Sequence, residues 1–251
     1  LYFAGYPNGV FGLIDDSETT LIGEWHTSIQ SKHAKFIVPG ADGRIYSGNH
    51  NERESTGGAL GWFDPGDNSF GGIQFPHDDC EWMTTAKGGK YIVYLSDFTY
   101  VPTKPEVKDQ AGKVIVFDTE KREIIQQFSP LNDGSAGVAV ETGPGIILGI
   151  GKDDKVPTVY LANVETGTTL KKVSLPGPAP RFISAGPDGN VYLFVKDDLA
   201  RLNPESLELE ILCPAKPGRM AFLGNDLYIG GGPELRRFRN VVAATEKEAA
   251  K

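Results

Sequence analysis

Four histidines stand in the first 77 residues of this 251-residue chain, and three of them fall in segments between short apolar runs. His33 and His77 lie in short connections and His50 in a longer one, whereas His26 lies within a strand-like run. An imidazole titrates near neutral pH and can also bind a metal ion, so histidines in neighbouring loops can form a binding site or an acid–base site. A lone loop histidine is usually an ordinary turn or surface residue. The hypothesis of a site therefore depends on their meeting in space.

Charged and hydroxyl side chains accompany these histidines along the chain. Glu52 and Arg53 follow His50, and a pair of aspartates follows His77. Carboxylates beside an imidazole can hold a cation, and an arginine can neutralise a carboxylate on a ligand. The predicted ligand-binding residues are His33, His50, Glu52, His77, Asp78, Asp97 and Arg219. If the chain is an enzyme, its predicted catalytic residues are His50, His77, Tyr100, Arg53 and Arg181.

These assignments have structural alternatives. Glu52 and Arg53 can form an ion pair on a solvated loop, which contributes little to stability. Asp78 can belong to a turn that leads into the next strand. Arg181 and Arg219 precede apolar strand residues at similar places in two repeats, where they either bind a carboxylate or close an inner ring of strands.

A divalent cation is the one cofactor for which the residue types allow a prediction. Asn49, Glu52 and Asp97 are its candidate ligands, although a hard cation needs six or more oxygens in register. The glycine-rich segments Gly57-Gly58 and 230–232 lack the strand-to-helix context of a phosphate-binding loop. We expect them to allow close approach of strands.

A sequence repeat must position these residues. Five apolar, strand-like runs each end in Asp or Asn at a turn, and they recur at intervals of roughly 40 to 55 residues. The short polar side chain at each turn can accept hydrogen bonds from backbone N–H groups two residues on. The turn residues are Asp15, Asp64, Asp118, Asn163 and Asn203.

A second hairpin signal precedes most of these turns, as at Asp42-Gly43, Gly88-Gly89 and Asp188-Gly189. Two hairpins per repeat, with almost no helical periodicity, are typical of the four-stranded blades of a β-propeller. A two-sheet sandwich is the competing fold, but it gives no reason for one two-hairpin unit to recur. The sequence predicts an all-β propeller of four-stranded blades, with strands a to d from the inside outward. Large aromatic residues such as Trp62, Trp82 and Phe63 are expected to pack between blades.

The blades are expected in one domain over residues 1–240, followed by a tail over 241–251. The first blade shows only strands b, c and d, and the last only a, b and c. Because a propeller closes by pairing its end strands, the missing strands are expected upstream of Leu1. An added d and a strand would close a ring of six blades, and a further blade would make seven. The predicted blades lie near 1–30, 33–76, 80–131, 136–177, 180–214 and 218–240.

Three stretches of the sequence carry a family resemblance. GKVIVFDTEKREIIQQFSP (112–130) and PTVYLANVETGTTLKKVSLPG (157–177) resemble bacterial propeller repeats of the YVTN, quinoprotein and gluconolactonase-like groups. DGRIYSGNHNERESTGGALGWFDPGDNSFGG (42–72) resembles bacterial propellers of unassigned activity. The resemblance implies the fold and an exported location, periplasmic or extracellular. It implies no reaction, because propellers host unrelated functions.

Loop lengths favour one face of the predicted ring. The a-to-b turns are minimal, whereas two b-to-c connections, over 48–58 and 96–112, are long. Ligands bind where long loops converge, so the site is expected on the face where the d-to-a and b-to-c connections emerge.

Composition excludes some functions. The formal net charge of −8 excludes an electrostatic grip on nucleic acid. No apolar run reaches the ~18 residues that span a bilayer. The favoured function is binding of a small polar ligand or glycan, because it needs only converging polar groups and no activated acid or base. The alternatives are a lyase that acts on uronate-containing polysaccharides by His and Tyr acid–base chemistry, with Arg neutralising the uronate, and a metal-dependent lactonase or hydrolase. The residues leave open whether the chain is an enzyme.

Overall fold

The computed structural model of the chain describes residues 1–5, 9–16, 18–25, 33–50, 57–75, 79–96, 111–132 and 134–242. These residues form antiparallel strands arranged in six sheets, of which the first and last have three strands and the others four.

The strands follow one another along the chain within each sheet. The first sheet holds β1 (Tyr2–Gly5), β2 (Val10–Asp15) and β3 (Glu18–Glu24). The second holds β4 (His33–Pro39), β5 (Ile45–His50), β6 (Gly58–Asp64) and β7 (Ser69–Phe75). The third holds β8 (Cys80–Ala86), β9 (Tyr91–Ser96), β10 (Val114–Asp118) and β11 (Glu123–Phe128). The fourth holds β12 (Val138–Gly143), β13 (Ile146–Asp153), β14 (Val156–Asn163) and β15 (Thr168–Ser174). The fifth holds β16 (Ile183–Ala185), β17 (Val191–Val195), β18 (Asp198–Leu202) and β19 (Leu209–Pro214). The last holds β20 (Arg219–Leu223), β21 (Asp226–Gly231) and β22 (Glu234–Phe238).

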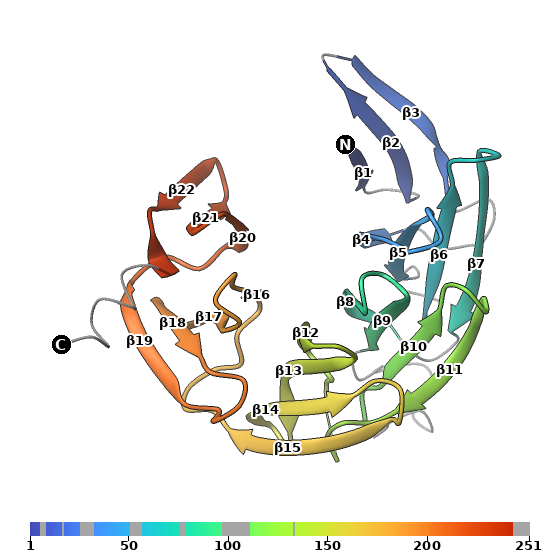
Figure 1. Cartoon of the computed structure of the whole chain (residues 1–251). Coiled ribbons are helices and arrows are strands. Elements are labelled where there is room, and N and C mark those ends of the chain that lie inside the picture. The colour runs from blue at the N-terminus through green and yellow to red at the C-terminus, as the bar shows by residue number, and fades with distance from the viewer. Residues whose placement is uncertain are drawn as a thin grey trace, which may run out of the picture.

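The six sheets stand side by side around a common axis, in chain order, as the blades of a β-propeller (Figure 1). The predicted all-β propeller is therefore confirmed. The arc of blades is open between the first sheet and the last (Figure 1). Strands at the centre of the arc are β4, β8, β12, β16 and β20, and strands at its periphery are β3, β7, β11, β15 and β19.

Each interface between neighbouring blades has its own hydrophobic cluster. Phe11 and Trp25 of the first blade pack against Phe63 of the second, and Tyr192 of the fifth packs with Ile229 of the sixth. Three further clusters fill the interfaces between the second and third, third and fourth, and fourth and fifth blades. A sandwich would bury one core between two layers, so these separate clusters exclude the competing fold.

The turn residues act as the sequence predicts. Oδ1 of Asp118 accepts hydrogen bonds from the backbone N–H groups of Glu120 and Lys121, at 2.9 and 3.0 Å. The oxygen of Asn163 holds the next repeat's turn in the same way. Asn203 does so in the fifth blade. Because these bonds close the turn between the third and fourth strands, they fix where each outer strand begins.

Each of the two end blades has three strands among the described residues. The pairing of β2 with β3 contains a register shift. The same irregularity occurs between strands c and d of the third, fourth and fifth blades. Since β2 also ends at Asp15, it corresponds to a c strand and β1 to a b strand. Among the described residues, the first blade thus has strands b to d and the last has a to c.

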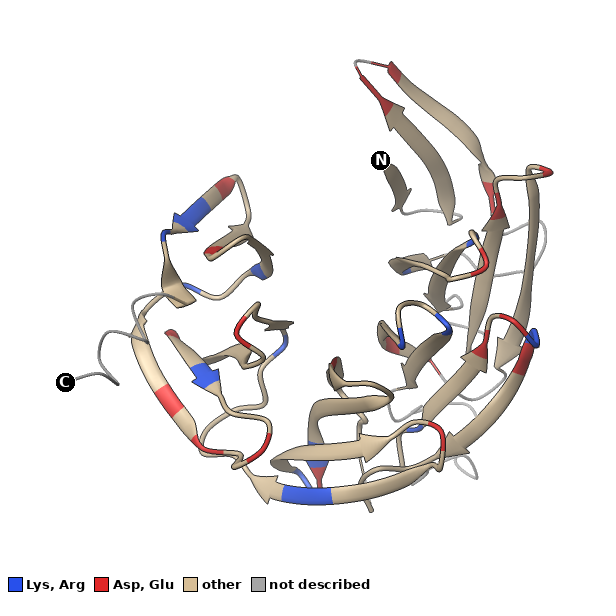
Figure 2. Cartoon of the chain, in the orientation of Figure 1, with Lys and Arg blue, Asp and Glu red and all other residues tan. Residues whose placement is uncertain are grey.

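Charge is spread over the outside of the arc. Figure 2 shows Lys and Arg on β15 and Asp and Glu on the neighbouring β19. Among the described residues, no helix is long and apolar enough to cross a membrane.

Candidate functional site

Two of the predicted ligand-binding histidines, His33 and His50, lie side by side where β4 begins and β5 ends. His33 opens β4 and His50 closes β5, and the two residues are partners in the strand register. Their ring centroids lie 4.7 Å apart with an interplanar angle of 35°. The start of an inner strand and the end of the second strand both face the side where the d-to-a and b-to-c connections emerge. The face selected from loop length therefore carries both imidazoles.

A carboxylate from the next blade joins this pair. Asp79 immediately precedes β8, and its Oδ2 lies 3.5 Å from Nδ1 of His50. Both side chains are about one-third exposed, at 30% for His50 and 34% for Asp79. The other carboxylate oxygen of Asp79 is buried and has no hydrogen-bond partner among the described residues. Asp79 adjoins the predicted ligand-binding residue Asp78, which lies outside the described residues.

An aromatic pair lies further along the same inner strands. The rings of Phe36 on β4 and Trp82 on β8 have centroids 4.9 Å apart. Nε1 of Trp82 donates a hydrogen bond of 2.8 Å to the backbone oxygen of Ala139 on β12, which fixes the indole. Each ring follows an extra residue in its strand, Lys35 in β4 and Glu81 in β8, where the register shifts.

Arg219 reaches this aromatic pair from the opposite side of the arc. It opens β20, which lies across the centre from β4 (Figure 1). Its guanidinium carbon nevertheless lies 5.8 Å from the centroid of the Phe36 ring. Arg219 is exposed and makes no hydrogen bond or ion pair with any residue that the structure describes. The cation thus rests on an aromatic face rather than on a carboxylate.

A hollow of about 600 Å³ adjoins Arg219 on this face. It is formed by the d-to-a link before β20 and the turn between β21 and β22, which includes the glycines at 230–232. Phe182, just before β16, also lines it. Ile183 and Met220 occupy equivalent positions in their blades, because they pair with Leu193 and Ile229 of the next strands. The residue equivalent to Arg219 is therefore Phe182 and not Arg181. Arg181 is exposed and is not among the residues that line this hollow.

Several predicted site residues lie outside the described residues. They are Glu52, Arg53, His77, Asp78, Asp97 and Tyr100. Asn49, a predicted metal ligand, is described and fully buried, and its side chain exchanges hydrogen bonds with Ser47 in the same strand. Within the ranges that the structure describes, no three His, Cys, Asp or Glu residues are arranged to hold a metal ion.

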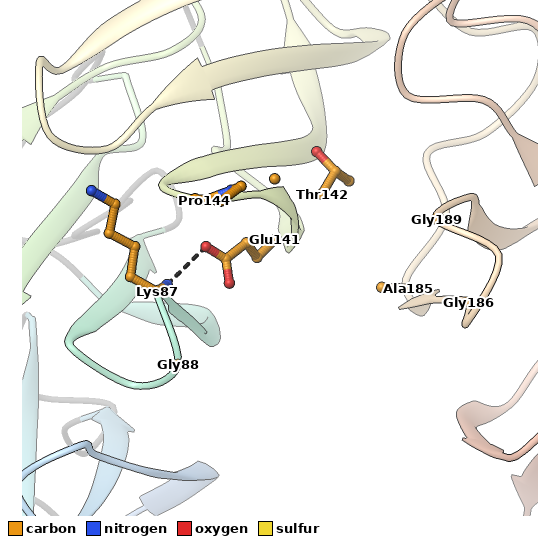
Figure 3. Close-up of a pocket in the computed structure, with 9 residues that line it drawn as sticks. Lys87, Gly88, Glu141, Thr142, Pro144, Ala185, Gly186 and Gly189 are labelled. Atoms are coloured by element: carbon orange, nitrogen blue, oxygen red, sulfur yellow. Dashed lines mark hydrogen bonds between the residues drawn. The ribbon is translucent and has the colours of Figure 1, made fainter.

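The opposite face has hollows that loop length did not predict. One of about 370 Å³ is lined by the a-to-b turns of three blades (Figure 3). The backbone N–H of Lys87 donates to Oε1 of Glu141 at 2.7 Å beside it. A second hollow of about 550 Å³ shares Thr142, Gly143 and Gly189 with the first. These turns are short, so only their arrangement around the axis, which the sequence does not show, forms the hollows.

None of the known protein-family models matches the chain, and neither does any curated protein sequence. Solved structures do match. A streptogramin B lyase structure has a TM-score of 0.67 and 13% identity, over 92% of this chain and 73% of that one. The extracellular domain of the putative hybrid two-component system BT3049 from B. thetaiotaomicron has a TM-score of 0.65 and 14% identity, over 94% of this chain and 32% of that one. The likeness shows the fold alone. It agrees with the resemblance of the repeats to bacterial propellers.

Proposed function

We propose that the chain binds a small polar ligand or a glycan at the centre of the ring, on the face of the d-to-a and b-to-c connections. The observation that carries the proposal is the contact of 3.5 Å between His50 and Asp79, which brings two blades together beside the imidazole of His33. The 600 Å³ hollow beside Arg219 on the same face falls within the range of ~300–1,000 Å³ of small-ligand pockets.

The chemistry of these groups suits recognition of hydroxyl groups. Imidazole nitrogens donate and accept hydrogen bonds, and a carboxylate accepts them. The Asp79 side chain is 34% exposed, so its carboxylate can accept a bond from a ligand hydroxyl. His33 and His50 lie on strands and Asp79 directly precedes one, so the backbone fixes their positions before a ligand binds. These side chains therefore lose little conformational entropy on binding.

The test is binding of a glycan panel measured by isothermal titration calorimetry. We expect His50→Gln and Asp79→Asn each to weaken binding of any glycan that binds the wild type by about tenfold. Thr142→Ala, which alters the hollows of the opposite face, is the matched control and should bind like the wild type. Loss of binding in the Thr142 variant, with the His50 and Asp79 variants unaffected, would move the site to the other face.

A polysaccharide lyase is the second candidate, and the His50–Asp79 contact favours it as well. A carboxylate on Nδ1 orients the ring, so Nε2 can take a proton next to a uronate carboxylate. One of the similar structures is named a lyase, which supports only the fold's capacity for such chemistry. Incubation with uronate polysaccharides, followed by ultraviolet absorbance of unsaturated products, separates the two candidates. Product that forms with the wild type and not with His50→Gln would favour the lyase.

We also propose that the protein is exported. The likeness to an extracellular domain supports this location. Fractionation of the producing cells tests it, since the proposal expects the protein in the periplasmic or extracellular fraction.

A further inference from the structure

We infer that the ligand of this site carries a carboxylate that pairs with Arg219 above an aromatic floor made by Phe36 and Trp82, so that its class is a uronic acid sugar. The inference rests on the proposed function, because it names the ligand class of the same site. It depends on observations separate from the histidine contact: a cation without an ion-pair partner in the part of the chain that the structure describes, a fixed aromatic pair, and the contact of that cation with Phe36.

Arg219 differs from the paired arginines of the blades. Arg44 contacts Asp64 at 2.8 Å and Arg201 contacts Glu210 at 2.5 Å, both within their own blades. Arg219 has no such partner among the described residues, although the chain carries more carboxylates than cations. A guanidinium presents donors in a fixed fork that matches a carboxylate bidentately. A guanidinium with no ion-pair partner among the described residues, on an inner strand of an acidic protein, is thus suited to take its carboxylate from a ligand.

The aromatic floor suits the carbon face of a sugar ring. Trp82 is anchored through its hydrogen bond to Ala139, and Phe36 lies against it at 4.9 Å with an interplanar angle of 53°. Both side chains are half-buried and pack against the clusters between blades, so part of the surface of each remains exposed. The C–H groups of a pyranose pack on such rings, and fixed side chains lose little entropy in doing so.

The inferred site combines three chemistries. Arg219 offers charge for a carboxylate, the Phe36 and Trp82 rings offer an apolar surface, and His50 and Asp79 offer hydrogen bonds for hydroxyl groups. A uronic acid residue carries a carboxylate, a C–H face and ring hydroxyls together. A neutral sugar has no carboxylate for Arg219, and a simple carboxylate has neither a C–H face for the rings nor hydroxyls for His50 and Asp79.

The test compares oligosaccharides of galacturonate, glucuronate and mannuronate with their methyl esters, which keep the ring and remove the charge. Calorimetry should show that the wild type binds at least one of the acids about tenfold or more tightly than its ester. Arg219→Gln should weaken binding of that acid by about tenfold and leave binding of the ester within about twofold. Arg219→Lys should fall between, because it keeps the charge without the fork.

Two further variants make the test specific. Arg239→Gln removes the same charge from the same blade, at an exposed position just beyond β22 on the opposite face, and should keep the preference for the acid. Phe36→Leu should weaken acid and ester alike by a few-fold. Unchanged thermal unfolding temperatures show that each variant is folded.

The outcomes separate the two proposals. Equal binding of acid and ester, or equal effects of the Arg219 and Arg239 changes, would overturn the inference and leave the proposed function standing. If Phe36→Leu binds the ester as tightly as the wild type does, Phe36 does not contact the sugar ring and the aromatic part of the inference is wrong. If the wild type binds none of these acids and none of the glycan panel, both the inference and the proposed function are wrong.

Discussion

The Tyr46 hydroxyl donates a hydrogen bond of 2.9 Å to Oδ2 of Asp42, four residues earlier in the same hairpin. The fifth blade repeats this arrangement with Tyr192 and Asp188, at 3.1 Å. Tyr46 is 1% exposed, so its hydroxyl has little access to water as an alternative partner. We expect Tyr46→Phe to lower the free energy of unfolding by about 1.5 kcal/mol, measured by urea denaturation, because a hydrogen bond to a charged group is lost.

Tyr228 is the matched control for this change. It occupies the equivalent position of the last blade, and its hydroxyl makes no hydrogen bond with any residue that the structure describes. Tyr228→Phe should leave the free energy of unfolding within about 0.5 kcal/mol of the wild type. A similar loss in both variants would show that the hydroxyl itself, rather than its bond to Asp42, is responsible.

Alkaline pH should destabilise the protein. Burial raises the pKa of Tyr46, Tyr160 and Tyr192 above that of an unfolded tyrosine. The folded chain then binds more protons than the unfolded chain above about pH 10, so this stability is present below that pH and is lost as pH rises. Each such tyrosine contributes a slope of about −1.4 kcal/mol per pH unit. Urea denaturation between pH 8 and 11 should show this decline.

Tyr160→Phe tests how much of the loss of stability at alkaline pH comes from Tyr160. The hydroxyl of Tyr160 donates to the backbone oxygen of Ala136 at 2.8 Å, so the variant should be less stable at pH 7 by about 1 kcal/mol. Its alkaline slope should be shallower than that of the wild type, because one buried ionisable group is gone. A variant with an unchanged slope would refute the assignment of that slope to Tyr160.

The repeat made the blades predictable, whereas the centre of the ring depends on features that the sequence conceals. Asp118 and Asn163 mark their turns by residue type alone, which is why the strand pattern could be predicted. The aromatic floor was not predicted as part of a site, because Trp82 has the residue type expected for packing between blades. The contact between Arg219 and Phe36 joins residues 183 positions apart in the chain. It requires the curvature of the arc, which brings β20 opposite β4, and the extra residue in β4, and neither leaves a local signal in the sequence.

An ion pair between the third and fourth blades should respond to acid. Oε2 of Glu165 lies 2.7 Å from Nζ of Lys87, and Oε1 accepts a bond of 2.7 Å from the Tyr91 hydroxyl. Lys87 first, and then Tyr91, holds the pKa of Glu165 below its usual value. The stabilisation is therefore present above about pH 4.3, the unfolded pKa, and is lost as pH falls through the lower folded pKa.

Glu165→Gln tests this ion pair through the thermal unfolding temperature. The wild type should unfold at a higher temperature than the variant at pH 7, and the difference should close by about pH 3. Added salt should also reduce it, because the pair is exposed. A difference that persists at pH 3 would mean that the amide disturbs packing rather than charge.

Gly149 and Tyr160 are register partners on β13 and β14, and the tyrosine ring lies across the glycine. A methyl group on Gly149 would overlap that ring, which is fully buried and held by its bond to Ala136. We expect Gly149→Ala to lower the free energy of unfolding by about 3 kcal/mol, since it overpacks the interface and displaces the hydroxyl. Gly5→Ala, where an added methyl meets no atom within 4 Å, should have little effect. In a Tyr160→Val background the Gly149 change should cost much less, because the overlapping ring is absent. An undiminished cost there would show that the backbone of Gly149, rather than the ring of Tyr160, requires glycine.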